Sequence, residues 1–158
     1  MASTSLVSRS ASRGVSDERL GELAARLRLA ITRTARRLRQ EAGTELSPSQ
    51  TAALATIERH GPLTPSFLAE LERVQRPTAT RIVARLTDEG LIERVADPAD
   101  GRSFTAAATP KGRALLNKLR TRKNAYLARR LRRLDQADLA ALERAAEILE
   151  QVLEGERR

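Results

Sequence analysis

The sequence predicts a mainly α-helical fold with one small β-hairpin. Apolar residues recur three and four positions apart over long stretches, which is the period of an amphipathic helix. The 158 residues include only two Phe, one Tyr and no Trp, so a core must be built mostly from Leu, Ala, Ile and Val, as suits packed helices. The exception is a run of strong turn formers at residues 97–103, which lies between two short extended segments.

The first helix is expected from Asp17 to about Glu41. Residues 1–15 are rich in Ser, Arg and small side chains and lack the apolar run of a secretory signal. We therefore expect a disordered tail there. The apolar row of the helix is spaced three and four residues apart and consists of Leu20, Leu23, Leu27, Ala30, Thr34 and Leu38.

Two shorter helices are expected next, because a capping residue followed by proline occurs at the start of each. Ser47-Pro48 with Gln50 has the pattern of a capping box, and it predicts a helix from Pro48 to about Arg59. Thr64-Pro65 repeats the signal and predicts a short helix through about Arg73.

A fourth helix is predicted to open at Gln75-Arg76-Pro77 and to end at Gly90, where a glycine suits a left-handed cap. Its residues divide into two faces. One face is apolar and is expected to be buried, with Ala79, Ile82, Val83 and Leu86. The opposite face carries Pro77, Thr80, Arg81, Ala84 and Arg85.

Strands are predicted over 91–95 and 103–107, on either side of the turn. Three helices followed by a hairpin give the order of a winged helix-turn-helix lobe. A helix then runs from Thr109-Pro110 to about Leu134. Asp135 caps a last helix, whose heptad-like row typically packs against another helix and consists of Leu139, Leu142, Ala146, Leu149 and Leu153.

Charge and composition limit the classes of function. The formal net charge is +9, which favours nucleic acid or anionic membrane surfaces as partners. Because cysteine is absent, disulfides, thiol redox sensing and thiolate metal sites are excluded. The sequence contains no run of about 18 consecutive apolar residues, which is the length that a membrane-spanning helix needs. We expect a cytoplasmic protein that does not bind membranes.

The strongest local charge is in residues 109–134, with ten basic and no acidic side chains. A phosphate-binding rail is one interpretation. We favour another, in which these charges lie in solvent or pair with the acidic last helix, through Glu143, Glu147, Glu150 and Glu154.

Catalysis and metal binding are not expected. His60 is the single histidine, and it falls at the expected end of a helix. A zinc site or a Ser/His/Asp set would have to be built around it, and no glycine-rich phosphate loop is present. We expect no enzyme activity, no cofactor and no metal.

The chain resembles the MarR family of bacterial transcription regulators over about residues 17–154. No single motif is diagnostic, but their order and spacing are. The motifs are Leu46-Ser47-Pro48-Ser49-Gln50, Gly61-Pro62-Leu63-Thr64, residues 76–86 (RPTATRIVARL), Gly90-Leu91-Ile92-Glu93-Arg94, the wing at 97–103 and Thr109-Pro110-Lys111-Gly112.

The resemblance implies a homodimer that places its two winged lobes on a pseudo-palindromic operator in double-stranded DNA. Residues 16–45 would be an N-terminal dimerisation helix, 46–108 the DNA-binding lobe, and 109–158 a linker helix and a C-terminal dimerisation helix. A lone recognition helix contacts few base pairs, so doubling it about a two-fold axis lengthens the site.

The recognition helix, residues 76–89, is expected in the major groove. Arg76 and Arg81 are the candidates for guanine, because a guanidinium fork can bind O6 and N7 together. Gln75 and Thr80 are candidates for base or phosphate contacts. Pro77 either touches a thymine methyl or simply starts the helix. Candidates for phosphate contacts, which set register, are Thr64, Ser66, Thr78 and Arg85.

The wing, residues 97–103, is expected in the minor groove, where narrow A·T tracts attract arginine. Arg102 matches the wing-tip arginine of the family, Asp100 its acidic partner, and Ser103 completes the wing. The alternative interpretation is a plain turn with a solvated arginine.

Three positions depart from the family pattern. Arg73 stands where many relatives carry glycine, and Glu72 falls near a position that is often apolar. Phe67 replaces a residue that is commonly polar, and it is expected either in the core or at the lining of a cavity beneath the lobe.

The protein is therefore predicted to be a sequence-specific, dimeric DNA-binding transcriptional regulator. We expect it to be a repressor that a small-molecule ligand releases from DNA. The resemblance implies a small aromatic or lipophilic effector bound between the dimer helices and the lobe. One alternative is a sequence-tolerant architectural DNA-binding protein. Others are a winged-helix module that has lost DNA binding and an amphipathic helix protein at anionic membranes.

Overall fold

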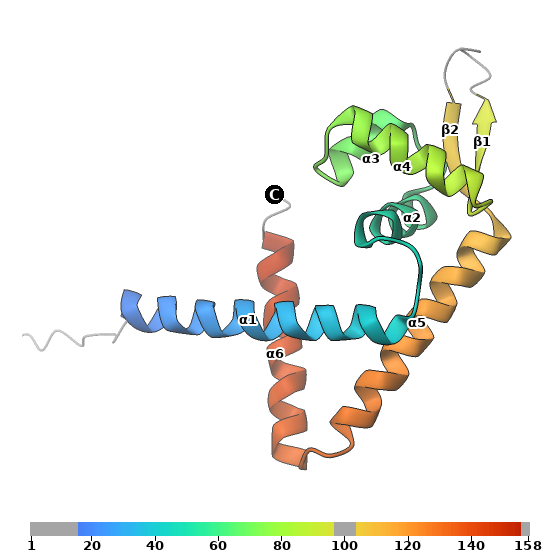
Figure 1. Ribbon diagram of the computed structural model, residues 1–158. Coiled ribbons are helices and arrows are strands. Elements are labelled where there is room, and N and C mark those ends of the chain that lie inside the picture. The colour runs from blue at the N-terminus through green and yellow to red at the C-terminus, as the bar shows by residue number, and fades with distance from the viewer. Residues whose placement is uncertain (1–15, 97–103, 156–158) are drawn as a thin grey trace, which may run out of the picture. The chain divides into compact units, whose positions relative to one another are not determined.

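Residues 16–96 and 104–155 are described by a computed structural model, which is mostly helical with one two-stranded antiparallel sheet (Figure 1). The predicted fold class is confirmed. The tail at 1–15 and the wing tip at 97–103 lie outside the described residues. The elements are α1 (Asp17–Ala42), α2 (Pro48–His60), α3 (Pro65–Leu71), α4 (Arg76–Asp88), β1 (Ile92–Ala96), β2 (Phe104–Ala108), α5 (Pro110–Leu131) and α6 (Gln136–Gly155).

The capping signals act as the sequence predicts. Ser47 Oγ accepts from the backbone N–H of Gln50, and the Gln50 side chain accepts in return from the backbone N–H of Ser47. Thr64 and Thr109 cap α3 and α5 with the side-chain oxygen alone, which accepts from the backbone N–H of Phe67 and of Gly112 respectively. Each of these three helices has a proline in its first turn, so its start is fixed by local chemistry.

The predicted boundaries of the hairpin strands, of α5 and of α3 were wrong by one to three residues. The strands begin at Ile92 and Phe104, one residue later than expected. The reason at the first strand is that the Leu91 N–H bonds the Leu86 carbonyl, so Leu91 closes the end of α4. The last turn of α5 is lost at Leu131, because the N–H of Leu134 bonds the Leu131 carbonyl in a tight three-residue turn.

The third wrong boundary is the end of α3, which lies at Leu71 rather than near Arg73. Arg73 adopts a φ of 52°, in the left-handed region that favours glycine. The Val74 N–H then bonds the Ala69 carbonyl. The chain therefore turns sharply between α3 and α4 at the position where the family pattern carries glycine.

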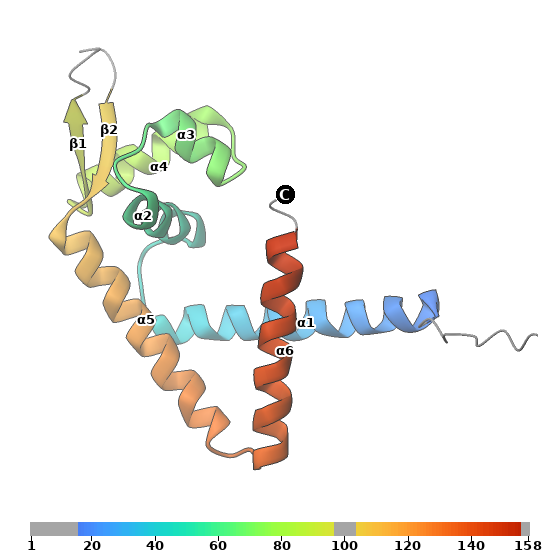
Figure 2. The ribbon, with the colours of Figure 1, turned by 180° about the vertical axis from the view of Figure 1, so that it is seen from behind.

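The core of the winged lobe is formed by α2, α3, α4, the hairpin and the start of α5. In Figures 1 and 2 the three short helices gather on one side of the hairpin. Gly112 allows α5 to approach closely, since a Cβ there would lie 2.1 Å from the Leu91 carbonyl oxygen. The largest fully buried side chains of this core are Leu54, Ile57, Leu68, Val83, Leu86 and Ile92.

The hairpin has one face turned into this core. Ile92 pairs with Ala108 and Arg94 with Ala106, and of these four only Arg94 is exposed. Leu63, between α2 and α3, forms two backbone hydrogen bonds with Ala106, of 3.1 and 2.8 Å. The root of the hairpin is therefore tied to the linker before α3.

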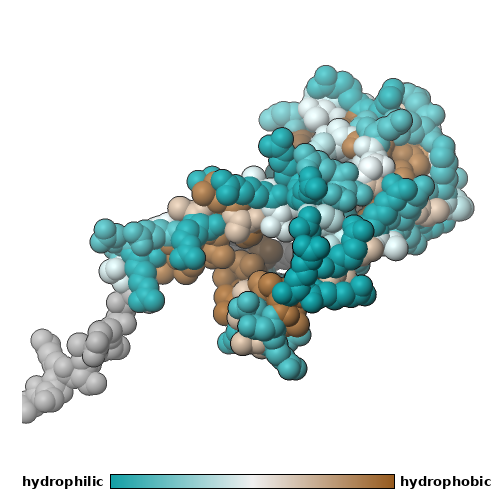
Figure 3. All heavy atoms as spheres, turned by 60° about the horizontal axis from the view of Figure 1, so that its bottom comes forward, coloured by the Kyte–Doolittle hydropathy of each residue, from teal (hydrophilic) through white to brown (hydrophobic). Residues whose placement is uncertain are grey.

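The terminal helices carry large apolar side chains at the surface, and brown apolar side chains are visible in Figure 3. Among the described residues, those up to Arg36 form one unit and those from Arg37 onward form another. Among the described residues of α1 only Ala42 is buried. The exposed apolar residues include Leu20, Leu23, Leu27, Leu29 and Ile31 of α1, and Leu142, Ile148, Val152 and Leu153 of α6.

No ion pair joins the basic helix α5 to the acidic α6 in the part of the chain that the structure describes. Among the described residues the one ion pair of α5 joins Arg120 to Glu58 of α2, at 2.7 Å. The predicted pairing is thus not found, and the alternative of solvated charge fits most of these side chains. Arg122 has another role, because its guanidinium donates to the Ala42 carbonyl at 2.9 Å and so caps the last turn of α1.

Candidate nucleic-acid interface

The helix α4 presents two faces, as predicted. Ala79, Val83 and Leu86 are fully buried and Ile82 nearly so. On the other side Pro77, Thr80 and Arg81 are exposed, and Arg76 is exposed at the first position of the helix. The core therefore fixes the rotation of the helix and leaves its basic face turned to solvent.

Several polar groups on this face are free to meet a ligand. Gln75 is the N-cap of α4, and its exposed side chain forms no capping hydrogen bond. Thr80 Oγ1 donates to the Arg76 carbonyl at 3.0 Å, which leaves its oxygen able to accept. Pro77 lies in the first turn, which satisfies its helix-starting role and leaves a thymine contact untested.

The expected phosphate contacts lie at the starts of α3 and α4 and at the end of α4. Thr64 Oγ1 accepts from the Phe67 N–H at 3.2 Å, so its hydroxyl proton remains available. Ser66 is exposed and Thr78 is partly buried. Arg85 forms an ion pair with Glu89, with 2.9 Å between Nε and Oε1. A phosphate bound by Arg85 would therefore share the guanidinium with the Glu89 carboxylate.

The wing-tip residues Asp100, Arg102 and Ser103 lie outside the described residues, so their predicted roles stay predictions. The described strands place the stem of the wing beside α4, which packs against β1. The structure thus brings the predicted residues of α3 and α4 into one lobe with the wing stem.

One basic residue of this region escaped sequence reasoning. The Arg94 guanidinium lies over the Phe104 ring, 4.5 Å from its centroid. The signal was available, since alternation along 92–96 places Arg94 on the same face as Ile92. Its stacking partner comes from the other strand, which the sequence does not indicate.

Three further residues have roles that the structure makes clear. Phe67 is 48% exposed, so the expectation that it lies in the core was wrong, and the alternative that it lines a cavity stays a prediction. Glu72 accepts a hydrogen bond from the Thr56 hydroxyl of α2, which explains a carboxylate at this position. His60 is the last residue of α2, as predicted.

In the described residues no group of three or more His, Asp or Glu side chains could hold a metal ion. No helix among them is long and apolar enough to cross a membrane.

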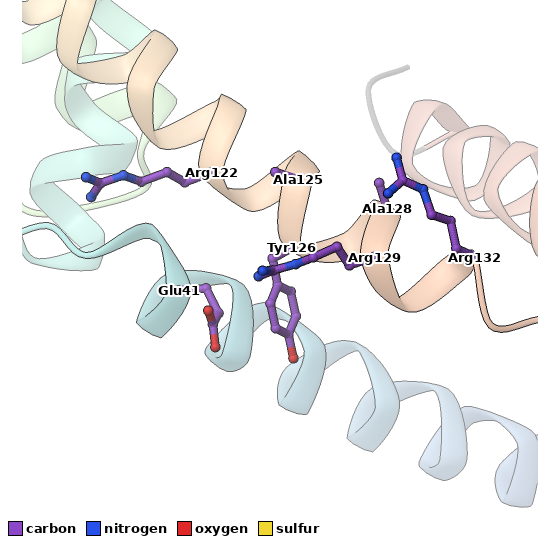
Figure 4. Close-up of a pocket in the computed structure, with 7 residues that line it drawn as sticks. All are labelled: Glu41, Arg122, Ala125, Tyr126, Ala128, Arg129 and Arg132. Atoms are coloured by element: carbon purple, nitrogen blue, oxygen red, sulfur yellow. The ribbon is translucent and has the colours of Figure 1, made fainter.

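A cavity of about 380 Å³ lies between the last turn of α1 and α5. Figure 4 shows Glu41 on the α1 side, with the other labelled side chains projecting from α5. The Tyr126 hydroxyl accepts from Arg37 Nε at 3.3 Å, and this phenol is the aromatic part of the lining. The lining is formed by Glu41, Arg122, Ala125, Tyr126, Ala128, Arg129 and Arg132.

Comparison with known proteins gives one consistent result. A family model described as the MarR family matches residues 46–104. An HTH-type transcriptional regulator of Mycobacterium tuberculosis is 36% identical over 128 residues, which cover 80% of this chain and 90% of that protein. A relative from Mycobacterium leprae, also described as an HTH-type transcriptional regulator, is 35% identical over 133 residues, 84% of this chain and 93% of its own length.

Solved structures agree. A protein from Pseudomonas aeruginosa described as a transcriptional regulator is 33% identical, with a TM-score of 0.78 over 88% of this chain and 98% of its own. A MarR family protein from Bacillus stearothermophilus shares the fold, with a TM-score of 0.77 at 23% identity over 89% and 99% of the two chains.

Proposed function

This chain belongs to the MarR family of DNA-binding transcriptional regulators, and from that premise we propose that it is a dimeric, sequence-specific repressor released by a small ligand. It would place α4 of each lobe in the major groove of a pseudo-palindromic operator and each wing in the adjacent minor groove. As a regulator that acts on DNA, it would work in the cytoplasm and need no cofactor.

The observation that carries the proposal is the two-faced helix α4. Its buried stripe fixes its orientation, and Arg76 and Arg81 project from the exposed face. A guanidinium fork discriminates guanine by about 1–3 kcal/mol when both hydrogen bonds form. Gln75, Thr80 and Pro77 flank these arginines and would read neighbouring bases or touch the backbone.

The remaining predicted contacts would set register and reach the minor groove. Thr64, Ser66 and Thr78 lie in or next to the first turns of α3 and α4, where hydroxyls can meet phosphates. Arg85 would join them. In the wing, Arg102 would enter the minor groove, with Asp100 holding its guanidinium and Ser103 at the end of the turn.

Dimerisation is supported by the exposed apolar rows of the terminal helices. Leu20, Leu23 and Leu27 of α1 and Leu153 of α6 are all more than a third exposed in the single chain. Rows of this kind bury their area against another helix. MarR family regulators act as dimers, and a second copy would cover these side chains.

The cavity beside Tyr126 is the proposed effector site. Arg122, Arg129 and Arg132 would attract an anion, and the Tyr126 ring would stack on an aromatic group. An aromatic carboxylate therefore fits this lining best. A panel of aromatic carboxylates and neutral lipophilic analogues should contain a compound that lowers operator affinity, and Arg129→Ala should weaken that response. Failure of the whole panel would remove the ligand-responsive part of the proposal.

Fluorescence anisotropy tests the DNA-binding proposal, with the duplex upstream of this protein's own gene and a scrambled duplex at near-physiological salt. Specific binding should exceed nonspecific binding by about 10³ or more. Arg76→Ala and Arg81→Ala should each lose about tenfold or more on the native duplex, and Arg102→Ala should also weaken binding. Arg59→Ala is the matched control, because Arg59 is exposed at the end of α2, outside α4 and the wing.

An architectural, sequence-tolerant function is the second candidate, and the observation that favours it is α5. Arg129, Arg130, Arg132 and Arg133 are exposed and, among the described residues, form no ion pair. Equal binding to native and scrambled duplexes with a steep salt dependence would support it. A large preference for the native duplex would exclude it.

A further inference from the structure

We propose that Arg94 is a further DNA-contacting residue of each lobe, which Phe104 holds against the sugar-phosphate backbone that separates the major groove from the minor groove. The inference rests on the proposed function, because it requires a duplex seated on α4. It adds a contact on the stem of the wing, which is distinct from the wing tip.

The register of the hairpin places Arg94 on the face that turns toward the lobe. Cross-strand pairs on this face are Ile92 with Ala108, Arg94 with Ala106, and Ala96 with Phe104. Ile92, Ala106 and Ala108 are buried, whereas Arg94 is exposed. Arg94 therefore lies where this face emerges from the core, on the side of the hairpin that the lobe helices cover.

Phe104 fixes the side chain of Arg94. The ring is partly buried and packs against the core, so it is a firm platform. The guanidinium lies over it at 4.5 Å from the centroid. Stacking uses the face of a planar guanidinium and leaves the N–H groups at its edge free to donate.

The charge of Arg94 is available to a ligand. None of the ion pairs found among the described residues includes it. The adjacent residue Glu93 lies opposite Ala107 in the strand register, so its side chain belongs to the other face of the hairpin. A cation that stacking orients, and that has no carboxylate partner among the described residues, is suited to a charge-assisted contact with phosphate.

The occupant follows from the arrangement of the two reading elements. The helix α4 packs directly against β1, so the major-groove element and the wing stem are neighbours. When α4 lies in the major groove and the wing lies in the minor groove, the strand between the two grooves must pass between them. Arg94 is exposed on β1, the strand that α4 packs against, and on the hairpin face that turns toward the lobe, so we place it at that passage.

A salt titration of operator binding tests the proposal, with wild type, Arg94→Ala, Arg94→Lys and Arg59→Ala. Each neutralised phosphate contributes about 0.9 to the slope of log K against log salt. A dimer carries two copies of Arg94, so the slope of Arg94→Ala should fall by about 1.8 and affinity by about tenfold or more. Because phosphate contacts do not read sequence, the ratio of native to scrambled binding should stay the same.

Two further variants examine the role of the ring. Arg94→Lys keeps the charge without a stacking plane and should retain most of the slope at reduced affinity. Phe104→Leu should weaken binding less than Arg94→Ala, and the double variant should be no weaker than Arg94→Ala alone, since the ring acts through the arginine. Circular dichroism and thermal unfolding report whether each variant is folded.

The outcomes separate this inference from the proposed function. Tight binding by wild type with an unchanged slope in a folded Arg94→Ala would overturn the inference and leave the proposed function intact. A fall in slope equal to that of Arg59→Ala would also overturn it, because a general loss of charge would then suffice. If the wild-type protein bound the native and scrambled duplexes equally, the proposed function itself would be overturned.

Discussion

In the winged lobe, Leu54, Leu68 and Leu86 are fully buried within one chain, whereas Leu27 of α1 is 38% exposed and Leu153 of α6 is 61% exposed. The lobe thus has a complete core of its own, and the terminal helices have apolar rows without one. Apolar area left in water contributes nothing to folding. The lobe can therefore draw its stability from the single chain, and in the dimer proposed above a second copy would supply the contacts that the terminal helices lack.

The largest expected effect comes from emptying the lobe core. Leu54→Ala should lower the free energy of unfolding by about 2–5 kcal/mol, because a buried leucine is replaced by a cavity. Chemical denaturation checks this value. The same change at Leu153, which is largely exposed, should alter the unfolding of the lobe by less than about 0.5 kcal/mol, and equal losses at both positions would break the comparison.

The next effect is on dimerisation and leaves the lobe folded. Leu27→Glu with Val152→Glu should weaken the dimer by about a hundredfold or more, since a two-fold axis places each charge twice in an apolar contact. Sedimentation velocity over a concentration series measures it. Exchange of Leu27 and Val152 for Met is the matched control, and an intact dimer in the glutamate variant would place the interface elsewhere.

A smaller effect sharpens the comparison within the lobe. Arg73→Gly should stabilise the protein by about 0.5 kcal/mol, because relief of the strained φ of 52° slightly exceeds the entropy that glycine adds to the unfolded chain. Ala52→Gly, at an exposed position in the interior of α2, should instead destabilise it by about 0.5–1 kcal/mol. Thermal unfolding compares the two, and a loss at both positions would contradict the strain argument.

The smallest effect concerns the ion pair that joins α2 to α5. The hydrogen bond from Arg120 lowers the pKa of Glu58. The ion pair therefore adds to the free energy of unfolding above the unfolded pKa of about 4.3, and this stabilisation is lost as pH falls through the folded pKa. Glu58→Gln should therefore cost a few tenths of a kcal/mol at pH 7 and nothing near pH 2. A difference that persists at that pH would assign the effect to packing.

Local chemistry explains what the sequence could predict. Capping residues followed by proline locate α2, α3 and α5, and the spacing of Ala79, Ile82, Val83 and Leu86 predicts both faces of α4. These features depend on residues near each other in the chain. The exposed position of Arg81 followed directly from them, whereas Arg76 is exposed as the first residue of α4.

The features that the sequence did not predict depend on contacts between residues that are distant in the chain. Leu91 closes α4 instead of opening a strand because its N–H meets the Leu86 carbonyl. Glu72 is explained by Thr56, sixteen positions away, and Arg94 by a ring on the other strand. The absence of ion pairs between α5 and α6 in the described chain has the same origin, because pairing depends on where helices lie and charge composition alone does not set it.

The two hydrogen bonds between Leu63 and Ala106 limit how this protein can respond to a signal. They join the hairpin to the segment that enters α3, while α4 packs on both α3 and β1. The reading helix and the wing stem are therefore linked through α3 as well as directly through β1. In the dimer proposed above, a regulatory signal would act most directly on the separation and mutual rotation of the two lobes. Release of the operator would then depend on the distance between the lobes, with little change of shape inside either one.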